Sequence, residues 1–445
     1  MRKIICLLVA SLLLLSGCTL LQGDHSEYAG IVADTKAWYG DHSEHAGIVA
    51  DTKAWYEEFI SLPIANENMT AQELRALCVD AFRLNLTMPW TPNQEIKYTY
   101  TLLSKSYDVL LPTGIAYSGL CYATGIKGAT YGNAWKMLPF WDPETGMLDI
   151  EAMGNVNVLN IISSACSYGA MQGWNRVSNS HGIKEMDSYS MYISNIVPVG
   201  PYQYEPYTYN YNFKDRQASK QIIAANGDEI MFESYACTLP ADGVFSSSSY
   251  HVMMISQNPV VVRRSDGTID PEQSYVHVHE QKSMGTRTED LNYLQENGVT
   301  MRPLGTVDRK VTFQTLLDKG YIPFTLKEFI GEDPVESGKA WLGTQNSVLD
   351  NGAELTAGEV FGYTLYANYN VCSIQVEVKA PDGKVLDSYS PHIGTNPKVL
   401  RCALTGGLDR DRVAAYADGK NTIHIYARLS TGELVEAFHT ILKLK

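Results

Sequence analysis

Hydrophobic positions recur along the chain with two different periods, which predict where helices and strands lie. In residues 69–86 they recur every three or four residues, and Thr70 with Glu73 forms a T-x-x-E capping box at the start. This pattern predicts an amphipathic helix whose buried stripe includes Cys78 as a small core residue. A second helix is expected over residues 46–60, where the folded body would begin.

Alternation of hydrophobic and polar positions predicts strands in four segments. These are residues 97–111, 226–236, 250–256 and 274–281. A turn-rich stretch separates the last two segments, so we expect them to pair. Helices and strands together indicate an α+β body over residues 57–340.

The pattern changes after residue 340, where alternation dominates and helical spacing is hard to find. Asp382-Gly383 and Thr431-Gly432 have the composition of hairpin turns. Residues 341–445 are therefore expected to form a small all-β sandwich, compatible with an immunoglobulin-like module.

The first residues have the layout of an export signal. Arg2 and Lys3 precede an apolar run over residues 4–15, and Leu-Ser-Gly leads to Cys18. This ending resembles the lipobox of bacterial lipoproteins. The resemblance implies removal of residues 1–17, lipidation of Cys18 and anchoring on the extracytoplasmic face of the cell membrane. The alternative is an ordinary signal peptide with an incidental cysteine.

Residues 18–56 are expected to form a tether. They contain a duplicated 17-residue segment, over residues 23–39 and 40–56, to which we assign no chemistry. The formal net charge of −14 argues against nucleic acid as a partner. The cysteines are too few and scattered for a disulfide scaffold, although Cys372 and Cys402 could pair.

Cys166 is the strongest candidate for chemistry. It lies between an apolar strand-like run and a helical pattern over residues 167–177, and a helix N-terminus lowers the pKa of a thiol. Small residues at 163–165 and 169–170 are expected to let a substrate backbone approach, with Met171 and Trp174 packed behind the thiol. A buried structural cysteine remains the alternative.

His251 begins one of the predicted strands, at the edge of the sheet where a general base is needed. The paired strand ends with His279 and Glu280. Either side chain could lie beside His251, orient its imidazole and favour the charged form.

The order of these residues resembles the CHAP and NlpC types of papain-like peptidoglycan amidase. The matching elements are Cys166, then His-Val-x-x-Ile from His251, then Val-x-Val-x-Glu-Gln ending after Glu280. Gly-Leu-Cys-Tyr at residues 119–122 also resembles a Gly-Leu-Pro-Tyr element of some relatives. Ala165 replaces the usual aspartate, and both spacings are longer than usual.

This resemblance covers roughly residues 114–281 and implies a papain-like fold, with the nucleophile on a helix packed against an antiparallel sheet. It implies Cys166 as nucleophile, His251 as base and Glu280 as the orienting acid, or His279 in the NlpC pattern. It also implies amide cleavage in cell-wall peptides without a cofactor or metal.

Rival interpretations remain open at this point. Cys121 is an alternative nucleophile, and His277 with His279 could form a metal pair, although exposed strand histidines are the simpler reading. Acyl transfer by the same thiol is equally compatible. A non-catalytic surface lipoprotein with a papain-like binding scaffold and an adhesion module is the competing class. The oligomeric state is left open.

Overall fold

The protein is an α+β chain of several helices and several sheets. The computed structural model describes residues 45–102, 105–123, 132–153, 158–178, 196–203, 216–282, 301–344, 347–348, 351–352, 355–356, 364–391, 401–403 and 409–443.

The described helices are α3 (His45–Ser61), α4 (Ala71–Thr87), α5 (Ala134–Met137), α6 (Leu159–Ile162), α7 (Cys166–Trp174), α8 (Ala218–Asn226), α9 (Asp228–Ala236), α11 (Phe313–Asp318) and α12 (Arg410–Ala414). The described strands before residue 340 are β1 (Pro89–Pro92), β2 (Ile96–Leu102), β3 (Lys105–Leu111), β4 (Ala116–Ser118), β5 (Cys121–Tyr122), β6 (Met147–Leu148), β7 (Ser163–Ser164), β8 (Ile196–Pro198), β9 (Gly243–Ser246), β10 (His251–Ile255), β11 (Tyr275–Glu280), β12 (Met301–Pro303), β13 (Thr306–Thr312) and β14 (Ile322–Leu326). The later strands are β15 (Ala340–Thr344), β16 (Ser347–Val348), β17 (Leu355–Thr356), β18 (Thr364–Ala367), β19 (Val371–Lys379), β20 (Val385–Tyr389), β21 (Arg401–Ala403), β22 (Thr422–Leu429) and β23 (Leu434–Lys443).

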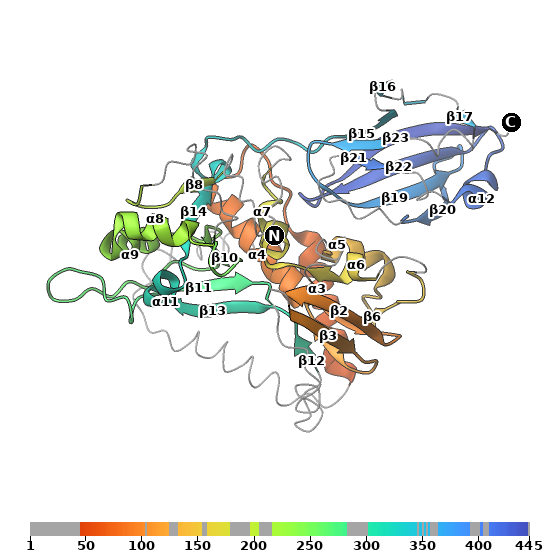
Figure 1. Ribbon diagram of the computed structural model, residues 1–445. Coiled ribbons are helices and arrows are strands. Elements are labelled where there is room, and N and C mark those ends of the chain that lie inside the picture. Colours follow the sequence, from red (N-terminus) through yellow and green to blue (C-terminus); the bar gives the residue numbers. More distant parts are fainter. Residues whose placement is uncertain are drawn as a thin grey trace, which may run out of the picture.

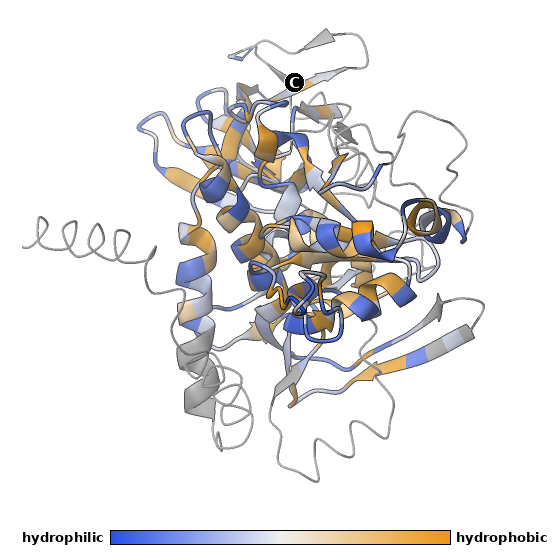
Figure 2. Cartoon of the chain, turned by 90° about the vertical axis from the view of Figure 1, so that its left-hand side faces the viewer, coloured by the Kyte–Doolittle hydropathy of each residue, from blue (hydrophilic) through white to orange (hydrophobic). Residues whose placement is uncertain are grey.

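A six-stranded antiparallel sheet forms the centre of the larger body, in the order β13-β11-β10-β9-β14-β8. Helix α7 packs on β10 and β11, and α4 packs on α7 (Figure 1). The predicted helix over residues 69–86 is confirmed as α4, with the capping box of Thr70 and Glu73 formed and Cys78 fully buried. Hydrophobic and hydrophilic residues alternate along the described helices in Figure 2, as expected for helices with one face in a core.

Close contact between α7 and its neighbours depends on two glycines. A Cβ at Gly169 would lie 2.5 Å from the Cβ of Gln281, and a Cβ at Gly173 would lie 2.4 Å from the carbonyl oxygen of Cys78. Neither distance is sterically possible, so any larger residue would push α7 away from α4 or the sheet.

One predicted strand is a helix. Residues 226–236 contain α9, which follows Gly227 at a φ of +85° and carries Asp228 and Glu229 in its first turn. Its buried residues include Met231 and Tyr235, four positions apart, so the helical period decides the structure and the apparent alternation was misread. The predicted strand over residues 97–111 is a hairpin of two strands, β2 and β3.

A second core lies beside the first. Helix α3, α5, α6, the four-stranded sheet β12-β4-β1-β6 and the β2–β3 hairpin enclose a cluster that includes Trp55, Trp90 and Tyr117. The helix expected over residues 46–60 is confirmed as α3. Cys121 lies in this second core and is 1% exposed.

Two sheets form the C-terminal part, in the orders β16-β15-β18-β21 and β17-β23-β22-β19-β20. They share a core cluster that includes Leu342 and Leu365 from one sheet and Ile425 from the other. The hairpin turns at Gly383 and Gly432 are confirmed, and both glycines have a positive φ. Cys372 is a free, buried thiol, and the side chain of Cys402, its proposed partner, lies outside the described part of the structure.

A buried arginine connects the two bodies, which lie side by side in Figure 1. Arg176 follows α7 and donates from Nη1 to the carbonyl oxygen of Thr431 at 2.9 Å, in the turn between β22 and β23. Its guanidinium lies 5.6 Å from the ring of Trp135, and Arg428 of the sandwich lies 4.6 Å from the same ring. Burial lowers the pKa of Arg176 to about 10. The end of α7 is thereby fixed against the sandwich.

Replacing Gly173 with alanine tests the close packing of α7. Alanine is the better helix former by about 1 kcal/mol, yet its Cβ has no room against Cys78. We expect Gly173→Ala to lower the free energy of unfolding by about 1–3 kcal/mol in denaturant titrations. The half-buried neighbour Gln172→Ala is the matched control and should have little effect. A stabilising Gly173→Ala would contradict the packing.

Candidate active site

Cys166 lies at the start of a helix, as predicted. Strand β7 ends at Ser164, Ala165 is the N-cap in an extended conformation, and α7 begins with Cys166. Ala165 supplies no side-chain cap, and the backbone N–H of Ser167 instead hydrogen-bonds the sulfur of Cys166. The N-terminal end of a helix stabilises a negative charge, which favours the thiolate.

His251 and Glu280 come together at one edge of the sheet. Strands β10 and β11 are antiparallel with Met254 opposite His279, so the start of β10 adjoins the end of β11. Nε2 of His251 lies 2.8 Å from Oε2 of Glu280, and the other ring nitrogen is left for the hydrogen bond to Cys166. The structure thus brings Cys166, His251 and Glu280 together, with the imidazole hydrogen-bonded to both the thiol and the carboxylate.

The three groups shift one another's pKa. Burial raises the pKa of Cys166, but the hydrogen bond and charge of His251 outweigh burial and leave it lowered. Burial lowers the pKa of His251, whereas hydrogen bonds to Cys166 and Glu280 raise it, with a net value of about 9. Both shifts favour the pair of thiolate and imidazolium over the pair of neutral thiol and neutral imidazole.

Other buried thiols provide the comparison. Burial raises the pKa of Cys78 well above its usual value and that of Cys372 to about 11. Cys166 is as buried as either, at 3% exposed, yet its pKa shifts in the opposite direction. The difference is His251, which neither of the other thiols has.

Two further cations hold Glu280, and neither of them was identified from the sequence. Arg309 on β13 donates to both carboxylate oxygens, at 3.1 Å from Nη2 to Oε2, and Nζ of Lys282 lies 2.8 Å from Oε1. Burial raises the pKa of Glu280, but His251, Arg309 and Lys282 together hold it well below its usual range. Glu280 therefore stays ionised although it is 1% exposed.

His279 does not occupy the third position. The register between β11 and β13 shifts between Val278 and Glu280, so regular alternation does not decide the direction of His279, and its contacts do. The ring of His279 lies 6.1 Å from the ring of Phe82 on α4, and its Nδ1 accepts from the backbone N–H of Asp308 at 3.2 Å. Burial lowers the pKa of His279 to about 4. The expectation of an exposed strand histidine was wrong for this residue, which is 1% exposed.

Tyr250 is a site residue that the sequence did not reveal. It has a φ of +47°, rare for a residue with a side chain, and its carbonyl oxygen lies 3.7 Å from Sγ of Cys166. Arg216 lies over its ring at 4.6 Å and donates from Nε to its hydroxyl at 2.9 Å. The unusual backbone conformation turns this carbonyl toward the thiol directly before His251.

The small residues around Cys166 serve packing rather than substrate approach, contrary to expectation. Ser163 and Ser164 are fully buried, and the space beside Gly169 is filled by Gln281. Met171 and Trp174, which were expected behind the thiol, are buried in the core on the same helix. A pocket of about 560 Å³ lies elsewhere, between α9 and the turn at residues 264–271, and none of the three site residues lines it.

The rival thiol is placed differently. Cys121 on β5 pairs with Ser163 on the parallel strand β7, within the second core. Cys18 and the remainder of residues 1–44 lie outside the described residues, as does most of the tyrosine-rich stretch over residues 200–213.

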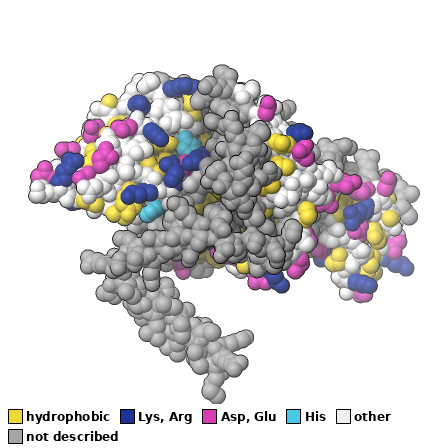
Figure 3. Space-filling model, turned by 90° about the horizontal axis from the view of Figure 1, so that it is seen from below, with side chains coloured by type: hydrophobic (Ala, Val, Ile, Leu, Met, Phe, Trp, Pro, Cys, Tyr) yellow, Lys and Arg dark blue, Asp and Glu magenta, His cyan; other side chains and the backbone are white. Residues whose placement is uncertain are grey.

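Acidic and basic side chains of the described residues are interspersed on the face shown in Figure 3. That face offers no broad basic surface for a polyanion. No helix within the described part of the chain is long and apolar enough to cross a bilayer.

Comparison with known proteins finds neither a matching family model nor a matching curated protein. Among solved structures, the crystal structure of an engineered protein is similar over 35% of this chain and 36% of that one, at 13% identity and a TM-score of 0.16. A TM-score this low carries no argument about fold or function.

Replacing Glu280 tests the electrostatic arrangement. Glu280→Gln removes the anion that stabilises the imidazolium, so the pKa of His251 should fall and that of Cys166 should rise. We expect alkylation of Cys166 at neutral pH to slow about tenfold for each unit by which the pKa of Cys166 rises. Mass spectrometry of the Cys166 peptide measures this rate.

His279→Asn is the matched control on the same strand, because His279 faces Phe82 instead of His251. Its pH profile of Cys166 alkylation should match that of the wild type. Equal slowing in both variants would mean that Glu280 acts only through the stability of β11.

Proposed function

We propose that this protein is an extracytoplasmic, membrane-anchored cysteine hydrolase of the papain-like CHAP/NlpC type, which cleaves amide bonds in peptidoglycan peptides. The observation that carries the proposal is that His251 contacts both Cys166 and Glu280, an arrangement that lowers the pKa of the thiol. A buried structural thiol has the opposite shift, as Cys78 has.

The arrangement of elements supports a papain-like body. Helix α7 bears the nucleophile at its first residue and packs on β10 and β11 of an antiparallel sheet. The base and the orienting acid lie on those two strands, in the chain order of the CHAP pattern. The contact of Glu280 with His251 favours this pattern over the NlpC pattern, in which His279 would be the third residue.

The proposed reaction has two stages. The thiolate of Cys166 attacks the amide carbonyl carbon, forming a C–S bond and an oxyanion to which the Cys166 backbone N–H can donate. The imidazolium of His251 gives its proton to the leaving amine as the C–N bond breaks, which leaves a thioester. Neutral His251 then takes a proton from water, and the resulting hydroxide cleaves the thioester to release a carboxylic acid and restore the ion pair.

Glu280 has a positioning role in this scheme. Its bond to Nε2 fixes the ring so that the other nitrogen faces the thiol, and its charge stabilises the imidazolium. Arg309 and Lys282 keep the carboxylate in place when the charge on His251 changes during the cycle.

Anchoring follows from the lipobox-like residues that end at Cys18. A lipid there places the body next to the cell wall and raises the effective concentration of an immobile substrate, which offsets the lack of electrostatic attraction for a chain of net charge −14. The substrate class rests on this location and on the family resemblance.

One observation favours the second candidate, a non-catalytic surface lipoprotein. Cys166 is 3% exposed, and the 560 Å³ pocket lies away from it. In that case the ion pair would stabilise the fold, and the sandwich would be the adhesion module.

Hydrolysis of purified peptidoglycan by the full-length protein separates the candidates. We expect released amino groups with the wild type, no activity with Cys166→Ala and a loss of about 10²–10⁴-fold with His251→Ala. Cys237→Ala removes an exposed thiol far from this chemistry and should keep full activity.

The pH profile provides a second readout. His251 must be protonated to serve the leaving amine, so activity should fall as the pH rises through about 9, where the raised pKa lies. At lower pH, activity should fall when the thiolate of Cys166 is protonated, at a pH below the ordinary pKa of a thiol. Inactivity despite rapid alkylation of Cys166 would exclude peptidoglycan as substrate, and slow alkylation would exclude the hydrolase.

A further inference from the structure

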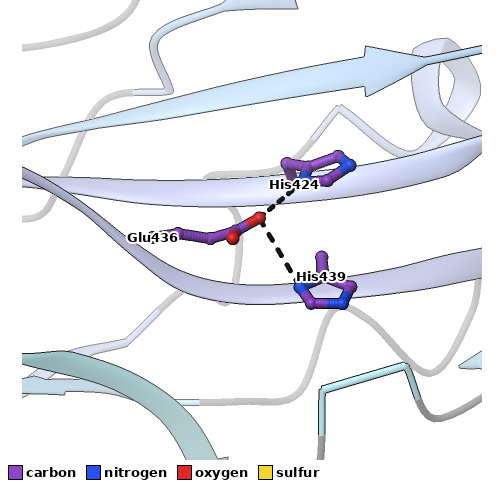
Figure 4. A group of neighbouring side chains, drawn as sticks. All are labelled: His424, Glu436 and His439. Atoms are coloured by element: carbon purple, nitrogen blue, oxygen red, sulfur yellow. Dashed lines mark hydrogen bonds and ion pairs between the residues drawn. The ribbon is translucent and has the colours of Figure 1, made fainter. Parts of the chain in front are cut away.

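A second cluster of chemically active side chains lies on the sandwich, far from the thiol in sequence. His424 on β22 is directly opposite His439 on the antiparallel strand β23, and their rings stack with centroids 5.5 Å apart. Glu436 lies between them, and the ring nitrogens of both histidines face its carboxylate (Figure 4).

A β-bulge brings the carboxylate to this face. Glu436 and His439 are three residues apart, so regular alternation would put them on opposite faces of β23. The register shifts between Ile425 and Tyr426: Phe438 pairs with Ile425 but Glu436 pairs with Tyr426, which leaves Ala437 as the extra residue. Bulges re-aim side chains at functional sites, and this one turns Glu436 toward the two histidines.

The three candidate ligand atoms converge. One ligand atom from each of His424, Glu436 and His439 lies within 4.8 Å of the other two. Oε1 of Glu436 lies 2.5 Å from Nδ1 of His424 and 3.6 Å from Nδ1 of His439. Ligand atoms around a tetrahedral zinc ion are about 3.3 Å apart, because zinc–ligand bonds are about 2.0 Å long. Small side-chain rotations bring the three atoms to that separation.

The two Nδ1 atoms differ in their hydrogen bonds. Nδ1 of His439 is shielded from solvent and has no hydrogen-bond partner in the described part of the chain. Nδ1 of His424 hydrogen-bonds Oε1 of Glu436 at 2.5 Å, and a bound ion would replace the proton between these two atoms. Nε2 of His424 lies 2.9 Å from Oγ1 of Thr422, and with a metal on Nδ1 the proton would lie on Nε2, which can donate to that oxygen. Such outer contacts fix the tautomer of metal-binding histidines.

We propose that His424, Glu436 and His439 bind one zinc-like divalent ion on the outer face of the sandwich. Two imidazoles and a carboxylate are a ligand set that suits Zn²⁺ rather than Ca²⁺ or Mg²⁺, which prefer oxygen. The two histidines are half-buried and Glu436 is exposed, so the fourth coordination position faces solvent and takes water or an external donor. The inference does not depend on the proposed hydrolase activity, because the metal site has no residue in common with the site around Cys166.

Titration of the full-length protein with Co²⁺ and Zn²⁺ tests the site. Co²⁺ reports the ligands through its visible spectrum, so binding to nitrogen and oxygen is distinguished from binding to the thiolate of Cys166 by the absence of a sulfur-to-cobalt charge-transfer band. We expect one equivalent bound in this way, with Zn²⁺ displacing the Co²⁺ and Mg²⁺ failing to do so.

The variants His439→Ala and Glu436→Gln should weaken this binding at least tenfold, while keeping the thermal unfolding of the wild type in EDTA. His277→Ala on β11 is the matched control for loss of a half-buried strand histidine and should bind normally. Binding that is unchanged in both site variants, or no saturable binding by nitrogen and oxygen ligands, would overturn the proposal.

Discussion

The candidate site depends on one buried carboxylate. Glu280 is almost completely buried. An ionised carboxylate at such a position is stable only when charged partners replace the water that it loses. Arg309 and Lys282 supply positive charge from one side, and His251 supplies it from the other. Because the carboxylate stays charged, the imidazole stays charged, and because the imidazole is charged, the thiol of Cys166 loses its proton. The charge of Glu280 at the end of β11 thus influences the proton of Cys166 at the start of α7.

Packing determines whether these charges meet. The thiol reaches His251 only if α7 lies close against β10 and β11, and Gly169 and Gly173 make that approach possible. The far end of the same helix is fixed by Arg176, which contacts both Trp135 and the sandwich. Displacement of α7 at either end would therefore change the distance between sulfur and imidazole, so the stability of the helix and the acidity of the thiol are linked.

Much of this arrangement could be predicted from local signals. The capping box fixed the start of α4, the helical pattern placed Cys166 at the first turn of α7, and paired strand signals brought His251 next to Glu280. The prediction for residues 226–236 was wrong because so short a segment fits either period, and the burial of Met231 together with Tyr235 favours a helix. Arg309 and Tyr250 could not be predicted, because their roles arise from β13 pairing and from a backbone conformation that no composition signals.

The protonation state of His251 is the central claim, and a histidine titration followed by NMR tests it most directly. With labelled imidazoles assigned through His251→Ala, the account predicts that His251 of the wild type loses its proton near pH 9. In Cys166→Ala the thiolate is gone, so the same ring should titrate at lower pH. A His251 that titrates near its ordinary pKa of about 6.5, unchanged by Cys166→Ala, would contradict the ion pair and with it the activated thiol.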